Sequence, residues 1–319
     1  MTLGGGHGYL SRRYGLTIDN LLSADVVLAD GRLVHASQDE NDDLFWALRG
    51  GGGNFGVVTS FEYRLHPVHT VVGGPLFWPI EKLETTMRWY RDWLPKAAED
   101  IYAFYLIARV PTVEPFPKAI HGNPICGLMW CHIGAKDGAE ATVQLAREVA
   151  EPIFEHVGPI PYPQLQSLFD KLYPAGHQWY WKGDFISELS DKAIAQHVRF
   201  AQVPTNQSLM HLYPINGAVH RTGKEATAWN YRDANWSMVI AAVDPDPSNA
   251  GKLRQWAREY WEALHPFTMG GAYVNFMMEE GEDRIKATYR ENFERLAAIK
   301  SKYDPNNLFQ VNQNIKPAV

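Results

Sequence analysis

Residues 45–59 read FWALRGGGGNFGVVT, and they set the order of the elements around them. The spacing of Leu44 and Leu48 predicts a short helix, and Gly50 ends it where a left-handed residue is usually required. Beyond the glycines, residues 57–65 alternate between apolar and polar side chains, which predicts a strand. The stretch is therefore a helix, a glycine-rich turn and a strand, in that order.

The glycines at 51–56 match G-x-G-x-x-G, the fingerprint of dinucleotide-binding folds. That fingerprint needs a strand before it and a helix after it, because the helix N-terminus binds the pyrophosphate. The order here is inverted, so we exclude a Rossmann NAD site. Two explanations of the glycines stay open, a tight turn or a ligand that approaches the main chain closely. A second cluster at 4–8, GGGHG, favours a phosphate-bearing cofactor, since two such loops can present several backbone N–H groups.

The rest of the chain alternates strand and helix patterns. Residues 24–36 predict a hairpin that turns at Asp30-Gly31. Amphipathic stripes predict four helices, at 83–94, 143–153, 253–264 and 282–302. Apolar and aromatic runs predict five strands, at 101–110, 124–133, 178–187, 207–220 and 227–243. Neighbouring strand runs of this kind are typical of an α+β fold, with a largely antiparallel sheet that carries helices on one face.

Composition narrows the class of protein. The chain has 319 residues, which is long enough for two domains, and its net charge is −6 at pH 7. An acidic chain without a basic stripe is not expected to bind nucleic acid or an anionic membrane surface. No apolar run reaches the roughly 18 residues that a membrane span needs. A small molecule is therefore the expected partner.

Two further classes of site find no support in the sequence. Cys126 and Cys131 are five residues apart on an expected strand, so their side chains point to opposite faces and are expected to be free thiols. The chain has no G-x-S-x-G, H-E-x-x-H or C-x-x-C motif, so neither a serine hydrolase nor a metal site is expected.

Three stretches together resemble one family. They are GGGHGYLSRRYGLTIDNLL at 4–22, FWALRGGGGNFGVVT at 45–59, and the tail NLFQVNQNI at 307–315. They resemble the FAD-linked oxidases of the berberine bridge enzyme type, in the vanillyl-alcohol oxidase superfamily. The resemblance implies the second half of a PCMH-type FAD-binding domain at 1–70, an antiparallel-sheet substrate-binding domain at 71–270, and a C-terminal segment at 271–319 that returns to the FAD domain.

The resemblance also assigns roles to single positions. FAD is the implied cofactor. The flavin and its ribityl-phosphate chain are expected along the first glycine cluster, the adenine half along the second, and the tail near the isoalloxazine ring. The cofactor-binding residues implied in this way are Gly5, Gly6, His7, Gly8, Gly15, Asp19, Asn20, Gly56, Val57, Val58, Asn312 and Gln313.

Two departures from the family pattern concern the substrate. The usual Asn-Tyr pair is Asn275-Phe276 here, so one phenol is absent. The strand that often carries a base reads HLYPING at 211–217, which places Tyr213 near that position. Tyr213 is the expected catalytic base, although a packed core tyrosine is an equally good explanation. The expected substrate-binding residues are Tyr273, Asn275, Phe276 and His211.

The expected function is that of an FAD-dependent oxidase. It would oxidise an alcohol, a sugar or a secondary metabolite by hydride transfer to flavin N5, with O₂ as acceptor. The chain opens on the first glycine cluster without a signal-peptide pattern, and the family's preceding half-domain is not found before Met1. We therefore expect an N-terminally truncated member, whose partner could be that missing half. The alternative is a non-catalytic fragment or binding module without a complete flavin site.

Overall fold

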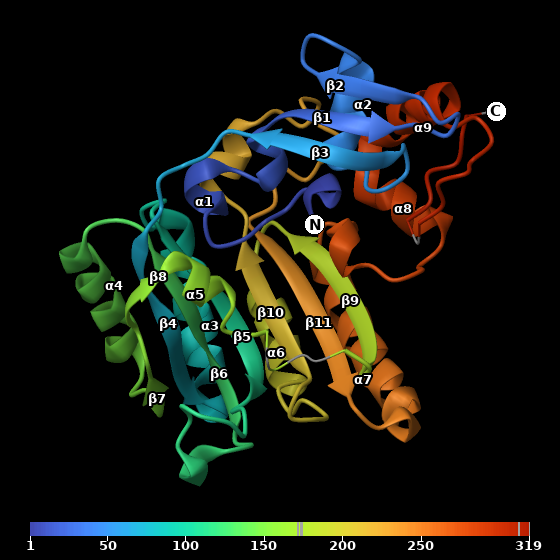
Figure 1. Ribbon diagram of the computed structural model, residues 1–319. Coiled ribbons are helices and arrows are strands. Elements are labelled where there is room, and N and C mark those ends of the chain that lie inside the picture. Colours follow the sequence, from blue (N-terminus) through green and yellow to red (C-terminus); the bar gives the residue numbers. More distant parts are fainter. Residues whose placement is uncertain (171, 173–174, 312, 319) are drawn as a thin grey trace. The chain divides into compact units, whose positions relative to one another are not determined.

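The computed structural model describes residues 1–170, 172, 175–311 and 313–318, and the chain divides into two compact units (Figure 1). The first unit contains Met1–His66, Ile215–Ala234 and Gly270–Val319, and the second contains Pro67–Pro214 and Asn235–Met269. The segment Ile215–Ala234 thus folds with the first unit, although the sequence analysis placed it inside the substrate-binding domain. The domain assignment itself stays a prediction.

A three-stranded antiparallel sheet organises the first unit. Its order is β2-β1-β3, with β1 at Leu21–Val27, β2 at Leu33–Ser37 and β3 at Val57–Tyr63. Pairing of Val26 with Val34 confirms the predicted hairpin. Helix α2 (Asp42–Leu48) comes directly before the glycines and β3 directly after them, which confirms the inverted order.

Short helical segments surround this sheet. They are η1 (Thr2–Gly4), α1 (Ser11–Tyr14), η2 (Thr17–Asp19), η6 (Gly217–Arg221) and η9 (Val274–Phe276). The core of the unit joins apolar residues of β1 and α2 to those of the C-terminal helices, including Leu44, Leu48 and Leu296.

The single helix predicted over 282–302 was wrong in one respect, because the structure breaks it into α8 (Glu282–Tyr289) and α9 (Phe293–Tyr303). Arg290 lies at the break with a φ of 47°, a left-handed conformation that a helix interior does not allow. Its guanidinium lies 3.7 Å from the centre of the Tyr231 ring and donates to Asp233 at 3.2 Å. Tertiary contacts of this kind override the local helical pattern.

The second unit is built on a larger sheet, in which every observed pairing is antiparallel. Its order is β7-β4-β6-β5-β10-β11-β9, and β8 pairs with β4. The strands are β4 (Thr70–Pro79), β5 (Ile101–Arg109), β6 (Pro124–His132), β7 (Phe154–Glu155), β8 (Gly158–Pro161), β9 (Gln178–Ile186), β10 (Leu209–Pro214) and β11 (Trp236–Asp244).

Four helices pack on one face of this sheet. They are α3 (Leu83–Trp93), α4 (Lys136–Val149), α6 (Asp191–Arg199) and α7 (Ala250–Leu264), while the short α5 (Tyr162–Gln166) follows β8. Their apolar stripes, such as Met87 and Tyr90 of α3, join Tyr105, Leu128 and Met210 of the strands in one core. This arrangement confirms the predicted α+β fold with helices on one face.

Two predicted strands are shorter than expected. The run at 207–220 is a strand only in β10, and the run at 227–243 only in β11. Between them, Gly217 has a φ of 72° and opens η6, so the chain leaves the sheet there. The apolar residues of 215–234 are buried in the first unit instead, as Ala228 shows.

Strand alternation places another set of side chains on the second face of the sheet. Tyr105, Leu128 and Met210 face the helices. Residues an odd number of positions away from them on the same strands therefore face the opposite side of the sheet. We call this surface the His211 face, and it carries Phe77, Phe104, Leu106, Met129, His211 and Tyr213. Cys126 lies on the helix side and Cys131 on the His211 face, and both are free and buried, as predicted.

Candidate functional site

The glycine cluster at 4–8 forms a loop that the rest of the first unit holds by its main chain. Thr17 donates its backbone N–H and its hydroxyl to the Gly6 carbonyl, at 2.7 and 3.0 Å. Ile18 donates to the Gly5 carbonyl at 3.1 Å, and the Gly6 N–H donates to the Tyr273 hydroxyl at 3.1 Å. The loop is therefore fixed from both sides before any ligand binds.

The positions of this loop differ in how closely protein atoms surround the glycine. A Cβ on Gly5 would lie 2.3 Å from the Trp229 ring, and one on Gly6 would lie 2.4 Å from the Thr17 hydroxyl oxygen. Both also have positive φ, 123° and 77°, so the fold itself requires glycine there. Gly8 differs, because a Cβ there would meet no atom within 4 Å. Gly8 thus leaves open space beside the loop, as the close approach of a cofactor requires.

An aromatic cluster packs against the loop. The His7 ring centre lies 4.4 Å from that of Tyr273 and 5.3 Å from that of Phe276, and Trp229 lies 5.2 Å from Tyr273. Burial lowers the pKa of His7 to about 3, so its ring is neutral at physiological pH. Burial also raises the pKa of Tyr273, which keeps its hydroxyl protonated. The side chain of Asn275 donates to that hydroxyl at 2.5 Å.

The polar residues expected beside the flavin are engaged within the first unit. Arg232 forms a bidentate ion pair with Asp19, at 2.8 and 2.7 Å, and Asp19 also accepts the Leu16 N–H at 2.8 Å. Asn20 donates to the carbonyls of Tyr14 and Leu16. A Cβ on Gly15 would lie 2.8 Å from the Asp19 carboxylate. Gly15, Asp19 and Asn20 shape the turn that supports the loop. Their contact with a cofactor stays a prediction.

The second glycine cluster is tied to the C-terminal tail. Asn54 donates to the carbonyls of Gly51 and Gln313, at 2.8 and 3.1 Å, and its side-chain oxygen accepts the Ile315 N–H at 3.0 Å. The buried Lys300 ammonium donates to the Asn54 carbonyl at 2.6 Å. The tail thus packs on the second glycine cluster, and its expected place near the isoalloxazine ring stays a prediction. Asn312 lies outside the described residues.

The remaining expected cofactor positions lie at the start of β3. A Cβ on Gly56 would lie 2.5 Å from Val26 and 2.7 Å from the Val27 carbonyl oxygen, so strand packing alone requires glycine there. Val57 is exposed and Val58 half-buried. Gln313 donates its side-chain amide to the Met277 carbonyl at 2.8 Å.

Sequence reasoning missed four residues that build this site. Arg12 is buried and donates to the Asn216 side chain at 2.8 Å, Arg232 pairs with Asp19, and Lys300 pairs with Asp304 at 2.6 Å. Lys300 could have been found, since it lies in the last turn of an expected helix, four residues before Asp304, which follows the end of that helix. Arg12, Asn216 and Arg232 carry no such signal, because their partners lie 204 and 213 residues away in sequence.

Two expected site residues lie together in the second unit. On β10, His211 Nδ1 and Tyr213 Oη share a hydrogen bond of 2.7 Å. The Phe104 ring centre lies 4.8 Å from that of His211 and 4.9 Å from that of Tyr213. Burial lowers the pKa of His211 to about 3, so at neutral pH it acts as an uncharged hydrogen-bond partner. His211 therefore supplies no positive charge beside Tyr213 at neutral pH.

The described residues contain neither a metal-binding cluster nor a membrane-spanning helix. Among the residues that the structure describes, no group of three or more His, Cys, Asp or Glu side chains could hold a metal ion. Across the same described part of the chain, no helix combines the length and apolar character of a membrane span.

Family models match both ends of the chain. The model described as "FAD binding domain" matches residues 1–37, and the model described as "Berberine and berberine like" matches residues 272–316. These matches contain the first glycine loop and the tail that packs on the second. Together they define a FAD-linked oxidoreductase.

Whole-chain comparisons give the same result. A FAD-linked oxidoreductase of Aspergillus terreus, pgmH, is 58% identical over 350 residues, which cover 100% of this chain and 68% of pgmH. The structure of 6-hydroxy-D-nicotine oxidase from Arthrobacter nicotinovorans matches with a TM-score of 0.85 and 25% identity, over 99% of this chain and 70% of that one. Xylooligosaccharide oxidase from Myceliophthora thermophila, in complex with xylobiose, has the same fold, with a TM-score of 0.81 and 23% identity over 100% and 70% of the two chains. The chain belongs to the berberine bridge enzyme type of FAD-linked oxidases, in the vanillyl-alcohol oxidase superfamily.

Proposed function

We propose that the protein oxidises a small organic molecule at a C–OH or C–H centre, an alcohol, a sugar or a secondary metabolite. The family supports the use of FAD, and the names of the similar proteins, a nicotine oxidase and a xylooligosaccharide oxidase, support a small-molecule substrate. When bound, FAD supplies a hydride acceptor at N5 of its ring and passes the electrons to O₂.

The first unit supplies the residues that would hold FAD. The loop at 4–8 is fixed by Thr17 and Tyr273, and Gly8 leaves the space beside it open. His7 and Phe276 add an aromatic wall that is neutral at physiological pH, which suits a planar, weakly polar ring system. The residues present therefore fit the cofactor. Contacts from Gly15, Asp19, Asn20, Gly56, Val57, Val58 and Gln313 belong to the same proposal.

The second unit supplies the proposed proton acceptor, Tyr213. The observation that carries this role is the 2.7 Å hydrogen bond between Tyr213 Oη and His211 Nδ1. A neutral imidazole that donates Nδ1–H to the phenolate oxygen stabilises the deprotonated tyrosine, which then accepts the hydroxyl proton of the substrate. His211 is buried and cannot turn freely, so it also fixes the direction in which the hydroxyl points.

The proposed function is tested by two measurements on the purified chain with added FAD. We expect the chain to hold added FAD only weakly and, at saturating FAD, to release hydrogen peroxide when it is mixed with members of a panel of aromatic alcohols and aldoses. Tyr213→Phe should retain the same flavin content and slow substrate-driven flavin reduction by about 10²-fold or more, the range for a lost general base. A chain that binds no FAD would instead support the non-catalytic binding module.

A further inference from the structure

Two adjoining pockets lie in the second unit, on the His211 face. Their volumes are about 490 and 530 Å³, within the range of roughly 300–1,000 Å³ that is typical of small-molecule sites. Phe77, Leu106 and Phe169 line both of them. A ligand that fills one pocket can therefore extend into the other.

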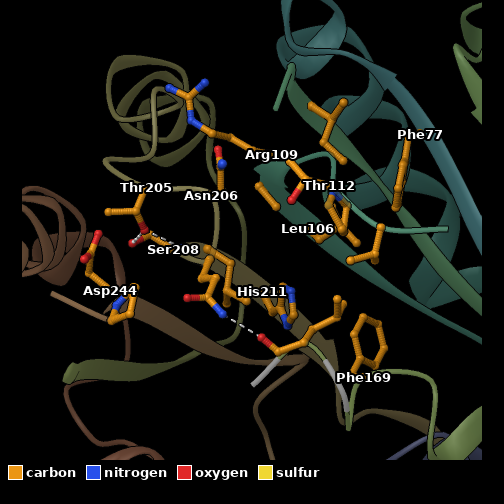
Figure 2. Close-up of a pocket in the computed structure, with 18 residues that line it drawn as sticks. Phe77, Leu106, Arg109, Thr112, Phe169, Thr205, Asn206, Ser208, His211 and Asp244 are labelled. Atoms are coloured by element: carbon orange, nitrogen blue, oxygen red, sulfur yellow. Dashed lines mark hydrogen bonds between the residues drawn. The ribbon is translucent and has the colours of Figure 1, made fainter. Parts of the chain in front are cut away.

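The two pockets differ in chemistry. The larger one is lined mainly by apolar side chains, among them Phe116, Met129 and Ile160. The smaller one has a polar end, at which Thr205, Ser208 and Asp244 lie, while Phe77 and Phe169 lie at its other end (Figure 2). The Thr205 hydroxyl donates to the Val243 carbonyl at 2.5 Å, and it accepts a hydrogen bond of 2.7 Å from the Ser208 hydroxyl. A ligand would thus meet rings on one side and hydroxyls on the other.

A row of rings connects this space to the proposed proton acceptor. The Phe169 ring centre lies 6.3 Å from that of Phe104, which in turn lies 4.8 Å from that of His211. His211 lines the smaller pocket and is hydrogen-bonded to Tyr213. A ligand in the pocket therefore contacts the residue that fixes the Tyr213 hydroxyl.

We propose that these adjoining pockets bind a planar aromatic substrate of two or three fused rings, with a hydroxyl or carbonyl group at the end near Thr205 and Ser208. This inference rests on the proposed function, and it selects one of the three substrate classes named there. Ring edges and faces of Phe77 and Phe169, which line both pockets, suit the faces of such a molecule.

An oligosaccharide that extends from one pocket into the other suits this space poorly, because the wall that both pockets share is apolar. Each sugar ring carries several hydroxyls, and a buried hydroxyl without a partner loses its hydrogen bonds to water. The shared wall of Phe77, Leu106 and Phe169 has no side-chain atom that could replace those bonds. The sugar that the similar xylooligosaccharide oxidase holds is accordingly not the ligand we expect here.

Calorimetric titration of the purified chain with 2-naphthol and with xylobiose tests this inference. We expect 2-naphthol to bind at one site per chain and xylobiose to give no binding heat. Phe169→Ala should weaken 2-naphthol binding at least fivefold, since Phe169 lines both pockets and is only half-buried. Ala108→Trp places a large ring in the smaller pocket and should weaken binding to a similar degree.

Phe267→Ala is the matched control. Phe267 is half-buried as well, but it packs against the core on the helix side of the sheet, so its removal should leave 2-naphthol binding unchanged. The inference is overturned if xylobiose binds and 2-naphthol does not, or if all three variants bind 2-naphthol as tightly as the wild type. Both titrations need no flavin, so their failure would leave the proposed flavin chemistry intact.

Discussion

Gly8 is the residue whose substitution tests the cofactor proposal most directly. The glycines around it are required by protein contacts, so their replacement damages the fold and says little about a ligand. Sequence alone could not separate these cases, because the Trp229 ring that blocks Gly5 lies 224 positions further along the chain. The glycine pattern predicted a cofactor loop, which stays a prediction, and only the structure shows that Gly8 faces open space.

Gly8→Val should lower the affinity for FAD at least tenfold and leave the free energy of unfolding within about 0.5 kcal/mol of the wild type. The branched Cβ fills the open space without meeting protein atoms. Flavin fluorescence titration measures the affinity, and urea unfolding measures the stability. Gly223→Val is the matched control in the same unit, since its Cβ also meets no atom within 4 Å. Equal FAD affinity in both variants would remove Gly8 from the cofactor site.

Elements were predicted well where one element's own pattern decides its structure. The stripes of α3 and α7 and the apolar runs of β5 and β6 gave their positions to within a few residues. The predictions failed at 282–302 and at 207–243, where contacts with distant residues decide. Arg290 breaks the last helix because it binds Asp233 and the Tyr231 ring, and neither lies near it in sequence.

The buried pair of Lys300 and Asp304 on α9 should be essential to the second glycine loop. Lys300→Met leaves the Asp304 carboxylate buried without its counter-ion and the Asn54 carbonyl without its donor, which should cost about 3–5 kcal/mol of unfolding free energy. Lys302→Met removes a surface ion pair with Asp43 and should cost less than about 1 kcal/mol. Denaturant unfolding of both variants checks this, and equal stability would show that Lys300 does not hold the loop.

His197 of α6 should make the protein less stable in acid. It is buried against Tyr260 of α7, 2.6 Å from the hydroxyl, and burial lowers its pKa to about 3 from the ordinary 6.5. Between these two values the unfolded chain binds a proton that the folded chain does not, so stability falls as the pH falls below 6.5. At pH 5 this single group should cost about 2 kcal/mol.

His197→Gln tests the effect, because glutamine does not titrate. The loss of stability between pH 7.5 and pH 5.0 should shrink by about 2 kcal/mol relative to the wild type. His35→Gln is the control with the opposite sign, since the hydrogen bond that His35 donates to the Asp25 carboxylate raises the pKa of His35. An unchanged pH dependence in the His197 variant would contradict the account.

At the scale of the whole molecule, the chain passes between its two units four times, and the sequence indicated only two of the crossings. The crossing near residue 67 coincides with a change of pattern from glycine-rich loops to long strands, and the one near residue 270 lies where the resemblance to the family resumes. The segment Ile215–Ala234, which belongs to the first unit, shows no change of sequence pattern at its ends, because its aromatic residues resemble those of the neighbouring strands. Its membership in the first unit follows from partners such as Asp19 and Gly5.

The reactivity of Cys126 and Cys131 measures how readily the sheet core of the second unit opens. Burial raises the pKa of Cys126 to about 11 and that of Cys131 to about 12, so neither is a thiolate at pH 8. We expect a disulfide reagent such as DTNB to label no thiol in the folded protein and two thiols in 6 M guanidinium chloride. Rapid labelling of the folded protein would show that the sheet core opens more readily than its packing implies.

The protein is a FAD-linked oxidoreductase, and we propose that Tyr213 is its proton acceptor. Anaerobic stopped-flow reduction of the bound FAD, in the wild type and in Tyr213→Phe, tests that claim most directly. The variant keeps the ring against Phe104 and loses only the hydroxyl, so flavin content should not change. The account predicts reduction about 10²-fold slower or more, and rates within about twofold of the wild type would contradict it.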